Sequence, residues 1–266
     1  MWIFFYCELN LQDKLMILIP IPENDFDPSE VSIPWRILTA KGHKVVFATP
    51  LGKKGNADKR MLLGDGLGIL KPILRASGDA RADYELLEKD QNFLKPISYE
   101  KIEPNAYNGI LLPGGHAKGM IPYLESKILQ SIIVNFFDQK KPVGAICHGV
   151  LLAARSIDPN TNKSVLYNLN TTSLLKKQEL LAYNLTKLWL GDYYLTYNIT
   201  VEDEVKSFLK HSSQFQSGNS GIFRDKMNNT SAGFTVRDQN FISARWPGDA
   251  HKFGYEFAQM VEKDST

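Results

Sequence analysis

The chain contains little cysteine: Cys7 and Cys147 are its only two cysteines, and neither belongs to a Cys-x-x-Cys pair. Two cysteines cannot form the disulfide framework that stabilises many small secreted domains. We therefore expect free thiols, a reducing compartment and a cytoplasmic location.

The chain also lacks an excess of charge of either sign. Its 31 lysines and arginines nearly balance its 29 aspartates and glutamates, which leaves a net charge of +2. Nucleic-acid binding depends on clustered cations, so this balance predicts no nucleic-acid partner. The five histidines form no His-Glu-x-x-His or other paired-ligand spacing, so we expect no bound metal. The glycine-rich stretch 64–68 follows no predicted strand and is not a dinucleotide fingerprint, and we predict no cofactor.

Long apolar runs are absent as well. The terminal stretch "MWIFFYCELNLQDK" (1–14) has an apolar run too short to cross a bilayer, and it lacks the basic flank of a signal peptide. We interpret residues 1–14 as an N-terminal extension, either an added edge strand or a tail packed on the surface. We expect no association with a membrane, and we expect Cys7 within this stretch to be inert.

The sequence predicts strands that alternate with helices along the chain. Short apolar runs predict strands over 15–21, 44–50, 107–112 and 143–146, and a hairpin over 234–245 around Asp238-Gln239-Asn240. Helical patterns predict a helix over about 30–41 with Ser29 as its N-cap, and further helices over 67–76, 79–90, 124–139, 148–156, 173–190, 200–210 and 248–263. Because such βαβ units imply a parallel sheet, the predicted fold class is α/β.

The composition and the spacing of these elements indicate one domain. Hydrophobic residues make up 43% of the chain, and no repeat or low-complexity linker divides it. We therefore predict a single domain over 15–266. Two regions interrupt the strand–helix rhythm, at about 52–105 and 157–232, and we interpret them as insertions.

One predicted strand, 143–146, leads directly into Cys147 and a following helix. A sharp strand-to-helix turn exposes its residue at the carboxyl edge of the sheet, where open α/β sheets place ligand sites. The helix N-terminus favours the thiolate, and the small residues Gly144 and Gly149 allow close strand–helix packing. This arrangement predicts that Cys147 is a nucleophile; the alternative is a buried, inert cysteine.

A nucleophile also needs a proton acceptor and donors for a developing oxyanion. His148 is the neighbouring imidazole, although it could instead pack beside the turn. Gly114 and Gly115, which follow the strand 107–112, can turn backbone N–H groups toward the elbow and, with the N–H of His148, hold an oxyanion. His116 either lines the pocket or caps this turn.

Glu30 is the predicted acid at the same edge of the sheet. It begins the helix after the first strand, so it could hydrogen-bond the sulfur or exchange a proton with a substrate. The alternative role is that of a first-turn acid favoured by the helix dipole.

Three motifs in order, Glu30 in "DFDPSEVSIPW", the turn "LLPGGH" and the elbow "AICHG", resemble the DJ-1/PfpI superfamily. The likeness is closest to its Hsp31-like branch, which is related to class I glutamine amidotransferase domains, and covers roughly residues 15–258. It implies a flavodoxin-like α/β/α sandwich with helical insertions and frequent homodimers. It also implies Cys147 as nucleophile, His148 as the neighbouring catalytic histidine and Glu30 as the acid beside the sulfur.

The resemblance also implies a range of activities. Members of the branch are associated with glyoxalase III activity, the cofactor-independent conversion of methylglyoxal to lactate, and with chaperone, deglycase and peptidase activities. We therefore expect a cysteine-dependent enzyme that acts on a small carbonyl compound. The alternatives are a stress-related holdase with a redox-sensing cysteine, and an amidotransferase- or peptidase-type hydrolase.

The chain departs from the branch in one respect. In the branch, an acidic residue downstream of the elbow orients the histidine, and here the corresponding region does not align cleanly. Glu179 is the candidate, although its helical pattern is also typical of a solvent-facing carboxylate. Thr171 and Thr172 are alternatives. The aromatic stretch "WLGDYY" (189–194) could line a pocket or a dimer interface, or pack in the core.

Overall fold

A seven-stranded sheet forms the centre of the molecule, in the order β10-β11-β7-β6-β1-β3-β5. The computed structural model describes residues 14–219 and 221–263. Cys7 and all of the predicted extension 1–14 except Lys14 therefore lie outside the described residues. Neighbouring strands are parallel except for the pair β10–β11. The strands are β1 (Met16–Pro20), β3 (Lys44–Thr49), β5 (Ile97–Ser98), β6 (Gly109–Leu112), β7 (Val143–Ile146), β10 (Thr235–Asp238) and β11 (Phe241–Ala244).

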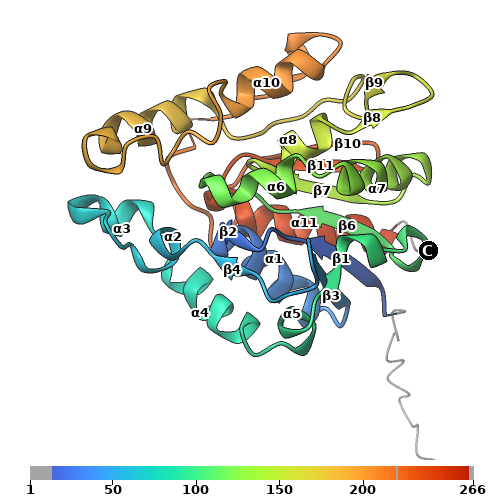
Figure 1. The fold of residues 1–266 in the computed structure, drawn as a ribbon, viewed down its shortest axis with the longest axis horizontal. Helices are drawn as coiled ribbons and strands as arrows, with labels where there is room; N and C mark the ends of the chain where they lie inside the picture. Colours follow the sequence, from blue (N-terminus) through green and yellow to red (C-terminus); the bar gives the residue numbers. More distant parts are fainter. Residues whose placement is uncertain (1–13, 220, 264–266) are drawn as a thin grey trace, which may run out of the picture.

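Helices cover both faces of this sheet (Figure 1). One face carries α1 (Pro28–Ala40), α4 (Gly78–Leu87), α5 (Gln91–Leu94) and α11 (Ala250–Lys263). The other carries α6 (Ile121–Leu124), α7 (Lys127–Asp138), α8 (Gly149–Ala154) and α10 (Val201–Phe208). The central strands β6 and β7 are buried along their whole length, as expected of a parallel sheet that helices enclose. This is the predicted flavodoxin-like α/β/α architecture.

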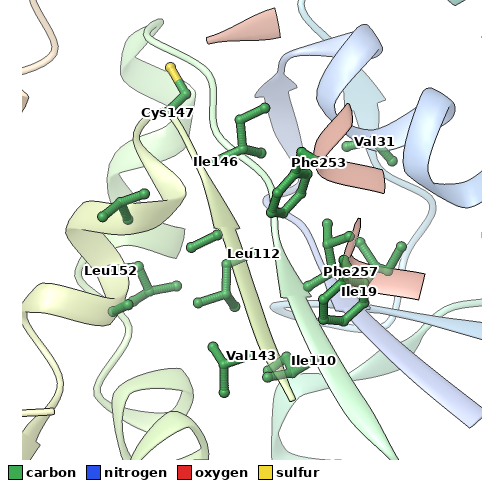
Figure 2. Packing of buried hydrophobic residues seen from close by; sticks show 14 of the residues in the cluster. Ile19, Val31, Ile110, Leu112, Val143, Ile146, Cys147, Leu152, Phe253 and Phe257 are labelled. Carbon is green, nitrogen blue, oxygen red and sulfur yellow. The ribbon is translucent and has the colours of Figure 1, made fainter. Parts of the chain in front are cut away.

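The core lies between the sheet and these helices. Figure 2 shows Phe253 and Phe257 of α11 on one side of the sheet, with Phe253 near Ile146 and Phe257 near Ile19, and Leu152 of α8 on the other side. All five side chains are fully buried. The elbow that follows β7 is therefore held from both sides by packed hydrocarbon.

The remaining elements are short, apart from one long helix. They are β2 (Asn24–Phe26), β4 (Asn56–Ala57), α2 (Lys59–Leu63), α3 (Lys71–Leu74), β8 (Ile157–Asp158), β9 (Lys163–Ser164) and the long α9 (Lys176–Leu190). In Figure 1, α9 lies at the same end of the molecule as α2 and α3. A hydrogen bond of 2.8 Å from Trp189 Nε1 to the carbonyl of Gly66 joins the two regions. Within the described residues, no helix combines the length and the apolar character needed to cross a membrane.

Several predicted elements differ from the observed ones. The helix predicted over 67–76 is confirmed in part: residues 68–74 are helical, but Gly68–Leu70 form a 3-10 turn and only the four residues of α3 are α-helical. Pro72 lacks an N–H group and lies in the first turn of α3, where no N–H partner is needed. The predicted helix 124–139 begins at Lys127, because Ser126 caps it by accepting a hydrogen bond from the N–H of Leu129.

The start of α1 also differs, and it bears on the site. The predicted N-cap Ser29 is wrong, because Asp27 caps the helix by accepting hydrogen bonds from the N–H groups of Ser29 (2.8 Å) and Glu30 (3.2 Å). Pro28 occupies the first turn, where no N–H partner is needed. The predicted hairpin is confirmed, since β10 and β11 pair around Gln239 and Asn240.

Candidate active site

Cys147 lies at the turn between β7 and α8 and has a left-handed backbone, with φ of 57°. Such a conformation is unusual for a residue with a side chain and is a feature of strained functional turns. The N–H of Cys147 is fixed by a 3.0 Å hydrogen bond to the carbonyl of Ala244 in β11. Gly149 lies so close to the carbonyl of Leu112 that a Cβ atom would overlap it. Figure 2 shows the sulfur beyond the end of β7, above Ile146.

Glu30 and Gly114 meet at this elbow. Glu30 is fully buried, and its Oε2 accepts a 2.7 Å hydrogen bond from the N–H of Gly114. A Cβ atom on Gly114 would lie 2.7 Å from the N atom of His148, so only glycine fits between α1 and the elbow. The other oxygen, Oε1, has no well-aligned partner, and the Cys147 thiol interacts with this carboxyl as a hydrogen-bond donor.

The surroundings of Glu30 favour its protonated form. Burial raises its pKa well above the ordinary value, and the neighbouring carboxylate of Asp27 adds to this. Hydrogen bonds from Gly114 and from the thiol oppose the rise. Glu30 therefore retains a proton at pH values where an exposed glutamate has lost it, which suits a group that exchanges protons with a substrate.

Burial also controls the protonation state of Cys147. The residue is only 4% exposed, and burial raises the pKa of its thiol well above the usual value. The charges of Glu30 and Asp27 raise it further, whereas the N–H of His148 lowers it. The expected thiolate is therefore a wrong prediction for the resting site: removal from water outweighs the contribution of the short helix α8.

His148 lies between the thiol and a hydroxyl group. Its Nδ1 is 3.5 Å from Sγ of Cys147, and its Nε2 is 3.0 Å from Oγ1 of Thr196. Oγ1 of Thr196 in turn donates a 2.6 Å hydrogen bond to the backbone carbonyl of His116. Burial, with smaller contributions from His116 and Arg155, lowers the pKa of His148 to about 3, so the imidazole is neutral.

Glu179 does not orient His148. Its Oε2 accepts a 3.0 Å hydrogen bond from the N–H of Val201 at the start of α10, and the residue is 3% exposed rather than solvent-facing. Burial raises its pKa to about 7. The alternatives Thr171 and Thr172 bind elsewhere, through hydrogen bonds to Oγ of Ser243 in β11.

The oxyanion donors differ in part from the predicted set. Gly114 has its N–H occupied by Glu30. The N–H groups of Gly115 and His148 have no nitrogen or oxygen acceptor among the described residues, and His148 presents its N–H to the sulfur. The N–H of His148 thus lies beside the thiol and suits a negative charge that develops on a bound carbonyl oxygen.

A segment after α9, Asp192–Thr196, packs against His116 and His148, and we call it the covering segment. Tyr194 stacks on the ring of His116 at 4.5 Å between ring centres, and Tyr193 meets the same ring edge-on at 4.8 Å. Tyr193 also lines a cavity of about 750 Å³ that includes Asp58 and Arg60 but not Cys147. The aromatic stretch 189–194 thus supplies both a cover over His116 and a wall of the adjacent cavity.

Arg224 is a further charged residue near the site that the sequence did not indicate. Its guanidinium lies over the ring of Trp246, 5.1 Å from the centre, and its charge acts on Asp27 and Glu30. Burial raises the pKa of Asp27 to about 6, and Arg224 opposes this rise. Among residues 14–219 and 221–263, no group of three or more histidine, cysteine, aspartate or glutamate side chains could hold a metal ion.

The fold and the elbow define a class of protein: a flavodoxin-like α/β protein with a cysteine between a parallel strand and a helix. The chain belongs to the ThiJ/PfpI family, because the family model described as ThiJ/PfpI family-like matches residues 21–219. The predicted DJ-1/PfpI resemblance is thereby confirmed.

Individual relatives are distant. A protein of Schizosaccharomyces pombe is 26% identical over 124 residues, which are 46% of this chain and 45% of that protein. The chain thus spans under half the length of this relative. A deglycase of Thermococcus kodakarensis is 23% identical over 167 residues, or 62% of this chain and 69% of the deglycase.

Solved structures show the same fold. The Rapid Encystment Protein of Francisella tularensis superposes with a TM-score of 0.69 at 17% identity, covering 93% of this chain and 99% of that chain. Glyoxalase III of Candida albicans superposes with a TM-score of 0.65 at 18% identity, covering 92% and 97%. At these identities the likeness is one of fold.

Proposed function

We propose that the protein is a cysteine-dependent enzyme that converts a small 2-oxoaldehyde, such as methylglyoxal, to the corresponding 2-hydroxy acid without a cofactor. The observation that carries this proposal is the contact between the Cys147 thiol and the buried carboxyl of Glu30, with the imidazole of His148 on the same sulfur. Family membership and the deglycases and glyoxalase III among the similar proteins support it.

The first step is the addition of Cys147 to the aldehyde. Sulfur forms a bond to the aldehyde carbon, and the carbonyl electron pair moves to oxygen, where the N–H groups of His148 and Gly115 can hold it. The thiol proton passes to Nδ1 of His148. An imidazole with a pKa of about 3 does not retain this proton and hands it to the oxygen, which gives a neutral hemithioacetal.

The second step moves a proton between adjacent carbons. As a carboxylate, Glu30 takes the proton from the sulfur-bearing carbon, which gives an enediolate, and then returns this proton to the neighbouring carbon. The hydroxyl hydrogen on the sulfur-bearing carbon passes to the oxygen of the neighbouring carbon, which leaves a thioester beside a new hydroxyl group. Because its pKa is raised, this carboxylate is a stronger base than an ordinary glutamate. Water then hydrolyses the thioester to the 2-hydroxy acid and the free thiol, so that 2-oxoaldehyde and water give the acid.

An amidotransferase or peptidase reaction fits this site less well. Such hydrolases use a carboxylate to orient the histidine and to stabilise the imidazolium that forms. Here the partner of His148 is the hydroxyl of Thr196, and Glu179 is bound at the start of α10. The site is therefore better suited to moving a proton within one small substrate.

Turnover of methylglyoxal by purified protein tests the proposal. We expect lactate formation by the wild type, loss of at least about 100-fold in Cys147→Ala and Glu30→Gln, and wild-type rates in Glu179→Gln. Glu179→Gln is a matched control, because it neutralises another buried glutamate that makes no contact with the elbow. Wild-type turnover in Cys147→Ala would show that the nucleophile is wrongly assigned.

A specific observation also favours chaperone activity as a second candidate function. Large apolar side chains are exposed along one stripe of α9, where Leu181, Leu185 and Leu188 are 60%, 48% and 91% exposed. Ile69 and Ile73, at the same end of the molecule, are 93% and 69% exposed. We call these five residues the α9–α3 face. Apolar surface of this kind can bind unfolded chains. A redox-sensing role for Cys147 fits less well, since its thiol is buried and has a raised pKa.

A further inference from the structure

Counting donors and acceptors fixes the hydrogen on His148. Thr196 has one hydroxyl hydrogen and two polar partners, the carbonyl oxygen of His116 at 2.6 Å and Nε2 of His148 at 3.0 Å. A carbonyl oxygen can only accept, so the hydroxyl hydrogen goes to His116. Oγ1 must then accept from His148, which places the ring hydrogen on Nε2.

This tautomer leaves a lone pair on the other ring nitrogen. Nδ1 of His148 is 3.5 Å from Sγ of Cys147, within hydrogen-bond distance for sulfur. The unprotonated Nδ1 can therefore accept the hydrogen of the thiol when that hydrogen turns from the Glu30 carboxyl toward the imidazole. In the opposite tautomer an N–H group would point at the thiol, and the imidazole could not take its proton.

We propose that Thr196 is a positioning residue that fixes His148 as the Nε2–H tautomer, so that Nδ1 accepts the Cys147 proton during addition to the substrate. This inference rests on the proposed function and deepens it. Thr196, in the covering segment, is buried at 5% exposure, and His148 is fully buried. Water therefore does not compete for the imidazole N–H.

A hydroxyl group differs from a carboxylate in what it does for the histidine. Both fix a tautomer, but a neutral hydroxyl does not stabilise an imidazolium. A thiolate–imidazolium pair is therefore disfavoured at rest, in agreement with the raised pKa of Cys147 and the lowered pKa of His148. His148 therefore accepts the proton from the thiol and passes it to the substrate oxygen, and it does not hold this proton in the resting enzyme.

The direct test is the tautomer of His148 in the wild-type protein, read from long-range ¹H–¹⁵N NMR spectra of ¹⁵N-histidine-labelled protein. Loss of one signal set in His148→Asn identifies the residue. We expect the Nε2–H pattern in the wild type, and an Nδ1–H pattern would overturn the proposal. This measurement needs no variant of Thr196 and no substrate, so it decides the proposal even if methylglyoxal is not turned over.

Variants of Thr196 test the consequence for turnover. In Thr196→Val we expect a mixture of tautomers, a kcat about 100-fold lower and an unchanged KM, whereas Thr196→Ser restores the tautomer and most of kcat. Thr186→Val is the matched control: it removes another fully buried hydroxyl, which bonds only within α9, and it should behave as wild type. Wild-type tautomer and kcat in Thr196→Val, or no recovery in Thr196→Ser, would overturn the proposal.

Discussion

Cys147 is held as a neutral thiol by the same carboxyl that we assign to proton transfer. After burial, the charge of Glu30 is the largest cause of the raised pKa of Cys147, and the hydrogen bond between the thiol and Glu30 raises this pKa by a smaller amount. Glu30 thus has opposite effects on reactivity toward two kinds of electrophile. It assists the proposed turnover of a carbonyl substrate, which needs proton transfer, but it hinders simple alkylation, which needs only a thiolate.

A pH series of alkylation separates these effects. In Glu30→Gln the negative charge is absent, so the pKa of Cys147 falls and iodoacetamide modifies the thiol at lower pH than in the wild type, even as turnover is lost. The measurement is the rate of modification of Cys147 against pH, followed by mass spectrometry. Glu179→Gln should leave this profile unchanged. A profile that moves to higher pH in Glu30→Gln would contradict the assigned electrostatics.

We expect the covering segment Asp192–Thr196 to control access to the site, because it packs against His116 and His148. It is anchored at the rim of the cavity by a hydrogen bond from the Tyr193 hydroxyl to Asp58 and by an ion pair between Lys118 and Asp192. Arg60 lies over the Tyr193 ring, 4.2 Å from its centre. These contacts are polar and lie near solvent, so each can break at modest cost, unlike the packed core beneath.

Loosening this segment should expose the thiol. Tyr193→Phe removes the hydrogen bond to Asp58, which contributes about 1 kcal/mol. We expect N-ethylmaleimide to modify Cys147 several-fold faster in this variant, with little change in Tm. Tyr183→Phe, a tyrosine of α9 outside the segment, serves as the control. Equal rates in Tyr193→Phe and the wild type would mean that access to Cys147 does not pass beneath Tyr193.

At the scale of the whole molecule, the proposed enzyme site and the α9–α3 face are separate surfaces. Variants should therefore divide the two candidate functions. Leu181→Glu with Leu188→Glu places charges on the apolar stripe, so we expect it to abolish suppression of client aggregation and to retain methylglyoxal turnover. Light scattering of heat-aggregating citrate synthase measures the first property.

Two controls complete that comparison. Lys187→Glu also alters charge on α9 but lies outside the apolar stripe, so it should retain both activities. Cys147→Ala should retain suppression and lose turnover. If the stripe variant suppresses aggregation as well as the wild type does, the α9–α3 face does not bind clients. Sedimentation of the same variants also tests whether this face supports the homodimer that we expect from the resemblance.

Local patterns determined much of this protein. The strand and helix order, the elbow at Cys147 and the place of Glu30 at the start of α1 follow from apolar spacing and turn residues that act over a few positions. The exceptions have local causes too, as when Asp27 rather than the predicted Ser29 caps α1.

Only the tertiary structure decided the protonation states and the partner of His148. Thr196 is 48 residues from His148 in the sequence and lies in an irregular segment, so no periodic pattern marks it, whereas Glu179 looked suitable and is bound elsewhere. The helix dipole favours a thiolate, but burial favours the neutral thiol and has the larger effect. The extent of this desolvation depends on every group that packs around the sulfur. Short-range patterns carry no information about that enclosure, which arises when distant segments close over one edge of the sheet.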